Sequence, residues 1–295
     1  MKKSAKMKGN PPTTGGKLVI DNIRAKEKKK NVKGLLGNSF PTIRPYDEYN
    51  PDDNTVSVMG TSIFDPVLCE ALYTWFTRPG AQILDPFAGG SVRGIVASYL
   101  GRHYTGIDLS AEQIAANIQQ GKKICTPDLM PQWIVGDSRD VQSLAPGAYD
   151  FILTCPPYTD LEIYSDDPKD ISTLGYDDFI IVLGDIIKNS VTMLNDNRFA
   201  AIVVGDVRDK DGFYHNFPAD TIEAFQAAGM RLYNEAILVT VAGSLPIRVG
   251  KSFTASRKMG KTHQNVLIFV KGNPKEATKW CGKVEVCGIM EKEDK

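Results

Sequence analysis

From residue 62 onward, the apolar positions of the chain follow two alternating patterns. Short apolar runs bounded by polar, Gly or Pro residues predict strands, and apolar residues at helical spacing between these runs predict helices. We predict seven strands, at residues 82–85, 104–108, 132–136, 151–154, 199–205, 232–241 and 265–270. We predict helices at residues 67–76, 91–100, 110–120, 176–194 and 218–228.

This alternation predicts an α/β fold of the Rossmann-like kind, with right-handed crossovers and helices on both faces of the sheet. The sheet is expected to be seven-stranded and mostly parallel. No helix is predicted between strands 232–241 and 265–270, so we expect these two strands to pair antiparallel at one edge. Ser110 is expected to cap the helix 110–120, with Gln113 completing a capping box.

The distribution of charge divides the chain into regions. Residues 1–33 carry eleven Lys and Arg and two acidic residues, a formal charge of +9, whereas the whole chain is neutral. We interpret residues 1–60 as a basic, largely irregular N-terminal arm, which could attract a polyanion or act only as a solubilising tail. Residues 61–272 form the predicted folded domain, which includes a basic loop at 241–262, and residues 273–295 are expected to be a peripheral C-terminal tail.

The composition argues against several classes of protein. No apolar run approaches the roughly 20 residues that span a bilayer, and the N-terminus has no signal-peptide core. The five cysteines include no C-x-x-C pair and the three histidines are dispersed, so no metal site is expected. We therefore expect a reduced, cytoplasmic, metal-free protein.

Several residues that can bind a ligand follow the predicted strands directly. In an open α/β sheet, ligands bind beyond the carboxyl ends of the strands, so residues at these ends should share one crevice. The turn Asp85-Pro-Phe-Ala-Gly-Gly90 opens a helix, and its backbone amides can approach a carboxylate or phosphate group. Asp108 at the next strand end can accept hydrogen bonds from ribose hydroxyls, and Asp137 can reach an amine or a ring edge.

The same turn indicates which ligand to expect. It contains no cation, and no Gly-Lys-Ser/Thr sequence is present, so a nucleoside triphosphate held by a P-loop is not expected. Asp85 at the start of the turn suits a ligand with a positive charge of its own. We therefore expect S-adenosylmethionine, which carries an ammonium, a sulfonium, a carboxylate, a ribose and an adenine, rather than a dinucleotide.

The predicted strand 151–154 runs into the turn Cys155-Pro-Pro-Tyr158. The two prolines fix φ and lack N–H donors, which leaves the carbonyl groups before them available as acceptors. Tyr158 adds an aromatic face beside these acceptors. By itself such a turn can be only a rigid corner, but beside the predicted cofactor loop it can hold a flat ring that bears an amine.

These motifs resemble those of the DNA amino-methyltransferases, which methylate adenine N6 or cytosine N4, including DNA methylases of phages and prophages. Asp85-Pro-Phe-Ala-Gly-Gly-Ser91 is similar to the family's cofactor loop, and Cys155-Pro-Pro-Tyr158 is similar to its catalytic Asp/Asn/Ser-Pro-Pro-Tyr motif. Phe64-Asp65-Pro66 with the following helix resembles the segment at the methionine end of the cofactor, and residues 263–271 resemble the closing strand. The resemblance covers roughly residues 62–272, in one of the motif orders of the family.

The resemblance implies an S-adenosylmethionine-dependent DNA methyltransferase of Rossmann-like fold, bacterial or phage-encoded, that modifies adenine N6 in preference to cytosine N4. It implies DNA as partner, leaves a homodimer open and makes no restriction partner evident. The implied catalytic residues are Cys155, Pro156, Pro157 and Tyr158. The implied cofactor-binding residues are Phe64, Asp65, Asp85, Pro86, Phe87, Ala88, Gly89, Gly90, Ser91, Asp108, Leu109, Asp137 and Ser138.

The sequence departs from the family pattern in two respects. Cys155 stands where the family has Asp, Asn or Ser, and sulfur is a weak acceptor, so the amine would depend more on the Pro156 carbonyl. Thiolate attack on cytosine C5 is disfavoured because the nucleophile of C5 enzymes follows a proline, whereas Cys155 precedes two. No separate target-recognition domain of the usual size is present. The alternatives are an RNA or protein-glutamine methyltransferase, or an inactive nucleic-acid-binding protein of the same fold.

The loop 241–262 is the predicted DNA-contacting segment. It contains no acidic residue and has Ser and Thr hydroxyls suited to phosphate contacts, although a merely solvated loop would share this composition. The residues expected to bind DNA are Arg248, Lys251, Arg257, Lys258 and Lys261.

Overall fold

A computed structural model describes residues 63–158, 165, 167–239 and 245–284, with the backbone alone at 245–248 and 251. The predicted basic arm at 1–60 lies outside these ranges. The chain divides into two compact units, residues 1–67 and 68–295, and the second unit contains the sheet. Among the helices of the described ranges, none is both long and apolar enough to cross a membrane.

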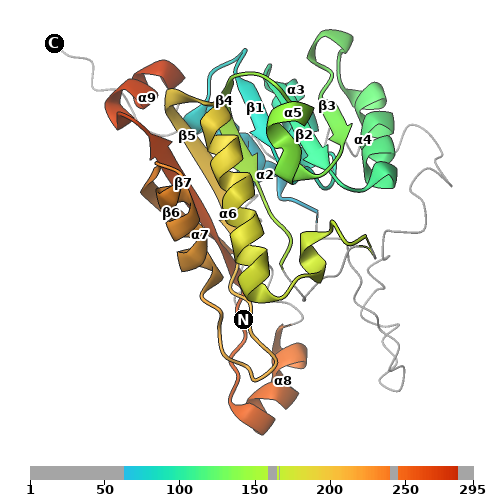
Figure 1. Cartoon of the computed structure of the whole chain (residues 1–295), viewed down its shortest axis with the longest axis vertical. Helices are drawn as coiled ribbons and strands as arrows, with labels where there is room; N and C mark the ends of the chain where they lie inside the picture. Colours follow the sequence, from blue (N-terminus) through green and yellow to red (C-terminus); the bar gives the residue numbers. More distant parts are fainter. Residues whose placement is uncertain (1–62, 159–164, 166, 240–244, 285–295) are drawn as a thin grey trace, which may run out of the picture. The chain divides into compact units, whose positions relative to one another are not determined.

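The sheet has seven strands in the order β3-β2-β1-β4-β5-β7-β6 (Figure 1). The strands β1 to β5 pair in parallel, whereas β7 pairs antiparallel with both β5 and β6. The predicted Rossmann-like α/β fold with a mostly parallel seven-stranded sheet is therefore confirmed. The strand bounds are β1 Gln82–Asp85, β2 His103–Asp108, β3 Gln132–Val135, β4 Tyr149–Thr154, β5 Leu194–Val204, β6 Arg231–Val239 and β7 His263–Lys271.

The last two strands pair antiparallel at one edge, as expected, but their order refines the prediction. The antiparallel strand β7 lies inside the sheet between β5 and β6, and β6 is the edge strand. Burial explains this order. Residues 266–270 of β7 are all buried, while nearly every residue of β6 is exposed, so the more apolar strand occupies the interior position.

Helices cover both faces of the sheet. In Figure 1, α5, α6 and α7 lie side by side over one face, and the contacts of α6 with its two neighbours agree with this view. The helices α3 and α4 pack against β2 and β3. The helix bounds are α2 Pro66–Phe76, α3 Val92–Tyr99, α4 Ala111–Ile124, α5 Val141–Leu144, α6 Tyr176–Met193, α7 Phe217–Ala227, α8 Leu245–Ser256 and α9 Pro274–Cys281.

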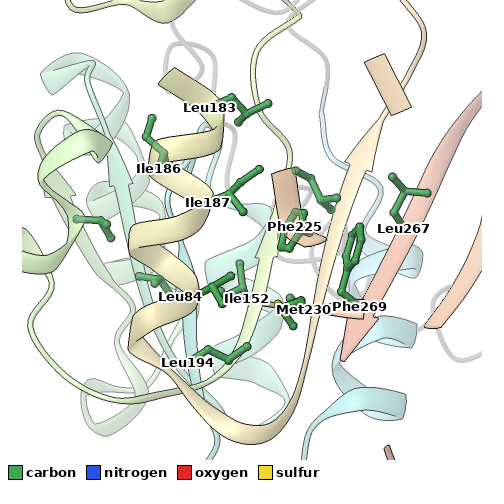
Figure 2. Close-up of a cluster of buried hydrophobic side chains, with 14 of the residues drawn as sticks. Leu84, Ile152, Leu183, Ile186, Ile187, Leu194, Phe225, Met230, Leu267 and Phe269 are labelled. Carbon is green, nitrogen blue, oxygen red and sulfur yellow. The ribbon is translucent and has the colours of Figure 1, made fainter. Parts of the chain in front are cut away.

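The main core lies between α6, α7 and the central strands. Figure 2 shows Leu183, Ile186 and Ile187 of α6 beside Leu84 and Ile152 of the sheet, and all of these side chains are buried. Further along, Phe225 of α7 stacks on Phe269 of β7, with 4.1 Å between ring centroids. Because this core joins α6 and α7 to five strands of the sheet, it fixes the strand ends that carry the candidate site.

Two segments differ from the prediction. The predicted loop 241–262 contains the helix α8, Leu245–Ser256. Residues 274–281, expected in the peripheral tail, form the helix α9, whose Ala277 is fully buried and whose Trp280 lies 3.7 Å below the Arg198 guanidinium. The sequence signal for α9 was the pair Asn273-Pro274, since the Asn273 side chain caps the helix and Pro occupies its first turn.

The predicted cap of α4 is half correct. The Ser110 hydroxyl accepts a hydrogen bond from the Gln113 N–H at 3.2 Å, so Ser110 is the N-cap. The reciprocal bond of a capping box is not formed, because the Gln113 side chain donates to Asn117 at 2.8 Å. The Ser110 N–H donates instead to Oδ1 of Asp108 at 2.8 Å, which ties the cap to the candidate site.

Candidate functional site

The carboxyl ends of three parallel strands meet at one edge of the sheet, because β2 and β4 flank β1. Asp85, Asp108 and Thr154 are the last residues of these strands. Two turns continue from this edge, residues 85–90 after β1 and residues 155–158 after β4. This is the position at which open α/β sheets bind ligands.

Asp85 faces the protein interior, and this corrects its expected role. Its side chain is fully buried and accepts hydrogen bonds from the hydroxyls of Tyr104 and Thr154, each at 2.7 Å. Arg93 forms an ion pair with it, with 2.5 Å between Nε and Oδ2. The positive charge that pairs with Asp85 is therefore Arg93, in the first turn of α3, and not a group of a ligand as expected.

The buried Arg93 side chain holds the backbone of the turn at residues 85–90. Its guanidinium donates to the backbone carbonyls of Phe87 and Ala88, the latter at 3.1 Å. Burial would by itself lower the pKa of Arg93, but the adjacent Asp85 carboxylate raises it above its usual value, so the ion pair stays charged. Sequence reasoning missed this residue. The available signal was a single charged residue in the otherwise apolar helix Val92–Tyr99.

The turn itself is fixed by bonds of its backbone. The Ala88 N–H donates to the Ile107 carbonyl at 2.8 Å, and the Pro86 carbonyl accepts from the Ser138 hydroxyl. Gly89 has φ +48°, and its carbonyl accepts from the Asn117 side chain at 2.7 Å. A side chain at Gly90 would meet no atom within 4 Å, so the turn presents open space at this point.

Ser91 and Phe87 also support the turn. The Ser91 hydroxyl bonds to the Gln120 side chain, and the half-buried Phe87 packs against the main core. Ser138 is buried and committed to Pro86. These predicted cofactor residues therefore hold the shape of the loop through their side chains.

Asp108, the last residue of β2, is partly buried, in contrast to the fully buried Asp85. Oδ2 accepts a hydrogen bond from the Gly89 N–H at 2.8 Å, and Oδ1 accepts from the Ser110 N–H at 2.8 Å. Burial raises the pKa of Asp108, and these two N–H groups oppose the rise. Each carboxylate oxygen keeps acceptor capacity beyond its one bond, which two hydroxyls of a ribose can use. Leu109 lies half-buried in the turn that follows.

Asp137 is paired within its own turn. The Arg139 side chain reaches both carboxylate oxygens, at 3.0 Å from Nε to Oδ1 and 2.9 Å from Nε to Oδ2. Burial would raise the pKa of Asp137, but the hydrogen bonds from Arg139 lower it below its usual value. The predicted contact of Asp137 with an amine would therefore have to compete with Arg139.

The turn Cys155-Pro-Pro-Tyr158 is joined to the cofactor loop through Thr154 and Asp85. Pro156 is buried, while Cys155, Pro157 and Tyr158 are half-buried. The Tyr158 hydroxyl accepts a hydrogen bond from the Gln264 side chain of β7, and the Tyr158 ring meets Phe217 edge-on at 6.1 Å. The ring is thus held in one orientation at the end of the sheet.

Beyond Tyr158, the end of β5 carries a second charged pair. Asp206 bonds to Lys261, and both side chains are partly exposed. Tyr158 lies against Gly205, since a side chain on this glycine would be 3.5 Å from the Tyr158 ring. The segment after β5 therefore forms the outer wall of the turn that holds Tyr158.

The predicted DNA-binding residues fall into three groups. Arg248 and Lys251 belong to α8, where their side chains are not among those described. Arg257 is exposed with φ +58°, directly after α8. Lys258 and Lys261 are half-buried, and Lys261 is bound to Asp206.

Phe64 and Asp65 belong to the first unit of the chain. Oδ1 of Asp65 accepts a hydrogen bond from the Val67 N–H at 2.8 Å, so Asp65 caps the first turn of α2. Their predicted contact with a cofactor stays a prediction.

The solved structures to which this chain is similar include several methyltransferases. No protein-family model matches the chain. TrmN from Thermus thermophilus shares 18% sequence identity at a TM-score of 0.47, over 70% of this chain and 49% of that chain, so the matched part is about half of TrmN. A methyltransferase from Pyrococcus furiosus shares 15% identity at a TM-score of 0.46, over 86% and 99% of the two chains. Magnesium protoporphyrin IX methyltransferase from Synechocystis PCC 6803, a structure with bound SAM, shares 13% identity at a TM-score of 0.46, over 70% and 79%.

Proposed function

We propose that the protein is an S-adenosylmethionine-dependent DNA methyltransferase that modifies an exocyclic amine of a base turned out of the duplex, with adenine N6 favoured over cytosine N4. The observation that carries this proposal is that two turns, one after β1 and one after β4, follow the ends of neighbouring parallel strands. The loop after β1 reaches Asp108, and the Cys155-Pro-Pro-Tyr158 turn follows the neighbouring strand β4. A methyl donor and a methyl acceptor bound at these turns would be adjacent.

The residues around Asp108 fit S-adenosylmethionine. Asp108 offers acceptor capacity to the ribose hydroxyls, and the space at Gly90 lets the backbone approach the ligand. The internal pairing of Asp85 with Arg93 leaves the loop without an unpaired charge of its own. When bound, the cofactor supplies a methyl group on a sulfonium, which needs no further activation by the protein.

The Cys155-Pro-Pro-Tyr158 turn would prepare the amine. The lone pair of an exocyclic amine is delocalised into the ring, so the amine is a poor nucleophile. Acceptors at Cys155 and Pro156 would take hydrogen bonds from its two N–H groups and favour the tetrahedral form, with the Pro156 carbonyl as the stronger of the two. Tyr158, held by Gln264, would stack on the base, a contact worth about 1–3 kcal/mol. As the new N–C bond forms, the C–S bond breaks and sulfur keeps its electron pair. The amine proton then passes to solvent.

The clustering of basic residues in two segments favours a polyanionic substrate, although the whole chain is neutral. Residues 1–33 carry a formal charge of +9, and residues 257–261 add three cations close to the end of β5. Cations near the site would contact phosphates and position the strand, whereas the pocket at Tyr158 would take the base. A protein-glutamine substrate would have no need of this charge.

The test is transfer of labelled methyl groups from S-adenosylmethionine to duplex DNA, to RNA and to a protein extract. We expect label in DNA, and after digestion to nucleosides we expect it in N6-methyladenine. The variant Asp108→Ala should lose cofactor binding by calorimetry, whereas Tyr99→Ala, an exposed position at the far end of α3, should retain both binding and transfer.

Three results would contradict the proposal. Label found in RNA or protein and absent from DNA would assign another methyltransferase class. Cofactor and DNA binding without transfer would indicate an inactive protein. An Asp108→Ala variant with unchanged cofactor affinity would remove Asp108 from the site.

A further inference from the structure

The connection between β5 and α7 forms a tightly built hairpin, residues 206–216, beside the candidate site. Arg208 and Tyr214 form a β-bridge across it. At its tip, Oδ1 of Asp209 accepts hydrogen bonds from the N–H groups of Gly212 at 2.6 Å and Phe213 at 2.8 Å, and the Asp209 N–H donates to the Phe213 carbonyl at 2.8 Å. The hairpin therefore has a defined shape at its tip.

The base of the hairpin is anchored to the body of the second unit. Val207 is fully buried, and its carbonyl accepts from the His215 N–H at 3.0 Å. The His215 ring stacks on Tyr176 of α6, with 3.9 Å between ring centroids and an interplanar angle of 12°. Because both ends are fixed, the tip cannot fold back onto the sheet without breaking these contacts.

This fixed tip presents an aromatic side chain to solvent. Phe213 is 72% exposed, and it is the most exposed aromatic side chain among the described residues. A single exposed apolar side chain is common on protein surfaces, so the surroundings of Phe213 decide its interpretation.

Cations surround the hairpin. The Arg208 guanidinium lies 3.7 Å above the Tyr214 ring, and Lys261 Nζ lies 5.2 Å from the same ring. Lys258 packs against Gly212, close enough that a side chain on this glycine would be 2.3 Å from its Cε. Residues 208–214 and 257–261 together have five basic and two acidic residues, a formal charge of +3. Of the two acids, Asp209 is used within the turn. Aromatic rings between cations suit nucleic acid.

The hairpin starts at the pocket proposed for the base. Gly205, the residue before it, lies against the Tyr158 ring, and Asp206 is bound by Lys261. In Figure 1 this connection descends from the end of the sheet next to α8. A base held at Tyr158 would therefore leave its stack close to the hairpin.

We propose that Phe213 inserts into the nucleic acid beside the target base and fills the place that the base leaves when it turns into the Tyr158 pocket. This inference rests on the proposed function, and it names the residue that would offset part of the free-energy cost of turning a base out of a duplex. Unstacking a base costs a few kcal/mol, and an aromatic side chain inserted in its place restores part of the stacking. Arg208, Lys258 and Lys261 would hold the flanking phosphates.

The experiment compares methyl transfer by Phe213→Ala, Phe213→Trp and wild type to one DNA sample, used as duplex and as heat-denatured single strands. We expect Phe213→Ala to lose at least about tenfold in rate on the duplex and to stay within about twofold of wild type on single strands, where no stack has to be opened. Phe213→Trp should retain duplex activity, and Tyr99→Ala serves as the matched exposed-aromatic control. Equal thermal unfolding midpoints show that the variants are folded.

The outcomes separate the two proposals. Equal duplex activity of Phe213→Ala and wild type would overturn the role of Phe213 and leave the proposed function intact. An equal loss on duplex and single strands would do the same, since it would indicate a general contact. Absence of label from every nucleic acid with the wild-type protein would overturn the proposed function, and the inference with it.

Discussion

Two ion pairs lie at the same edge of the sheet and differ in how far their side chains are exposed to solvent. Asp85 and Arg93 follow β1, and their side chains are 0% and 5% exposed, whereas Asp206 and Lys261 beyond β5 are 16% and 29% exposed. The first pair is enclosed by Tyr104 and Thr154. The second pair is partly exposed, although Oδ1 of Asp206 is itself buried and has no hydrogen-bond partner among the described residues.

The difference separates the two halves of the candidate site. On the β1 side, the buried pair sets the shape of the loop before any ligand arrives. On the β5 side, a partly exposed pair lies at the base of the hairpin that carries Phe213, and its Lys261 ammonium is the charge that a phosphate could contact. We interpret the first half as a fixed cofactor platform and the second as an adaptable substrate wall, and four predictions test this division.

The largest effect is expected for Arg93→Met. The substitution leaves the Asp85 carboxylate buried without its cation and should cost about 3–5 kcal/mol in the free energy of unfolding, measured by urea denaturation. The double variant Asp85→Asn with Arg93→Met removes the uncompensated charge and should recover about half of that loss. A single variant within about 1 kcal/mol of wild type would show that the pair does not hold the loop.

Tyr158 should matter for transfer rather than for folding. Loss of the stacking ring in Tyr158→Ala is expected to lower the rate of methyl transfer by about 10- to 100-fold. Tyr158→Phe keeps the ring and removes only the bond to Gln264, so it should stay within about fivefold of wild type. The two rates are measured with saturating cofactor, and near-wild-type transfer by the alanine variant would remove Tyr158 from the site.

The pH dependence of cofactor binding should report the state of Asp108. Burial raises the pKa of Asp108 in the folded protein, so the fold loses stability as the pH rises through that pKa and the side chain ionises. The ionised carboxylate, in turn, is a better acceptor for the ribose hydroxyls. We expect the affinity for S-adenosylhomocysteine, measured by calorimetry, to rise by about tenfold from about pH 4 to about pH 7. Asp108→Asn should bind more weakly with a flat profile. The same slope in both proteins would contradict this assignment.

The smallest effect is expected for Lys261→Met. Because the pair with Asp206 is partly exposed, its removal should change the free energy of unfolding by about 1 kcal/mol or less. The salt dependence of DNA binding should become shallower by about one unit of slope, because one phosphate contact is lost. A stability loss as large as that of Arg93→Met would erase the distinction between the two halves.

The sequence predicted the succession of strands and turns along the chain because their apolar pattern is regular. It also located Asp108 and the Cys155-Pro-Pro-Tyr158 turn at the ends of the two strands that flank β1. It did not predict which carboxylates would be paired within the protein, because this depends on partners distant along the chain. Asp85 is satisfied by Thr154, 69 positions away, and Tyr158 by Gln264, 106 positions away.

The sequence prediction also missed local structure in the C-terminal third. The helix α8 contains Pro246 and Gly250, which weaken its helical pattern, so its residues were expected to form a loop. Phe213 follows a short polar segment with two Asp, one Lys and one Gly, a composition typical of an ordinary turn. The contacts of that turn with Tyr176 and Lys258 distinguish it.

The position of β7 between β5 and β6 also affects how the protein is made. The ribosome delivers β6 before β7, yet within the described sheet β6 pairs with β7 alone. Neither β6 nor the free side of β5 can therefore complete this pairing until residue 271 has emerged. Until then β5, with its buried run of residues 199–204, presents an unpaired apolar edge of the kind that promotes aggregation. The nascent chain is therefore most exposed to misassembly in the interval between synthesis of β5 and of β7.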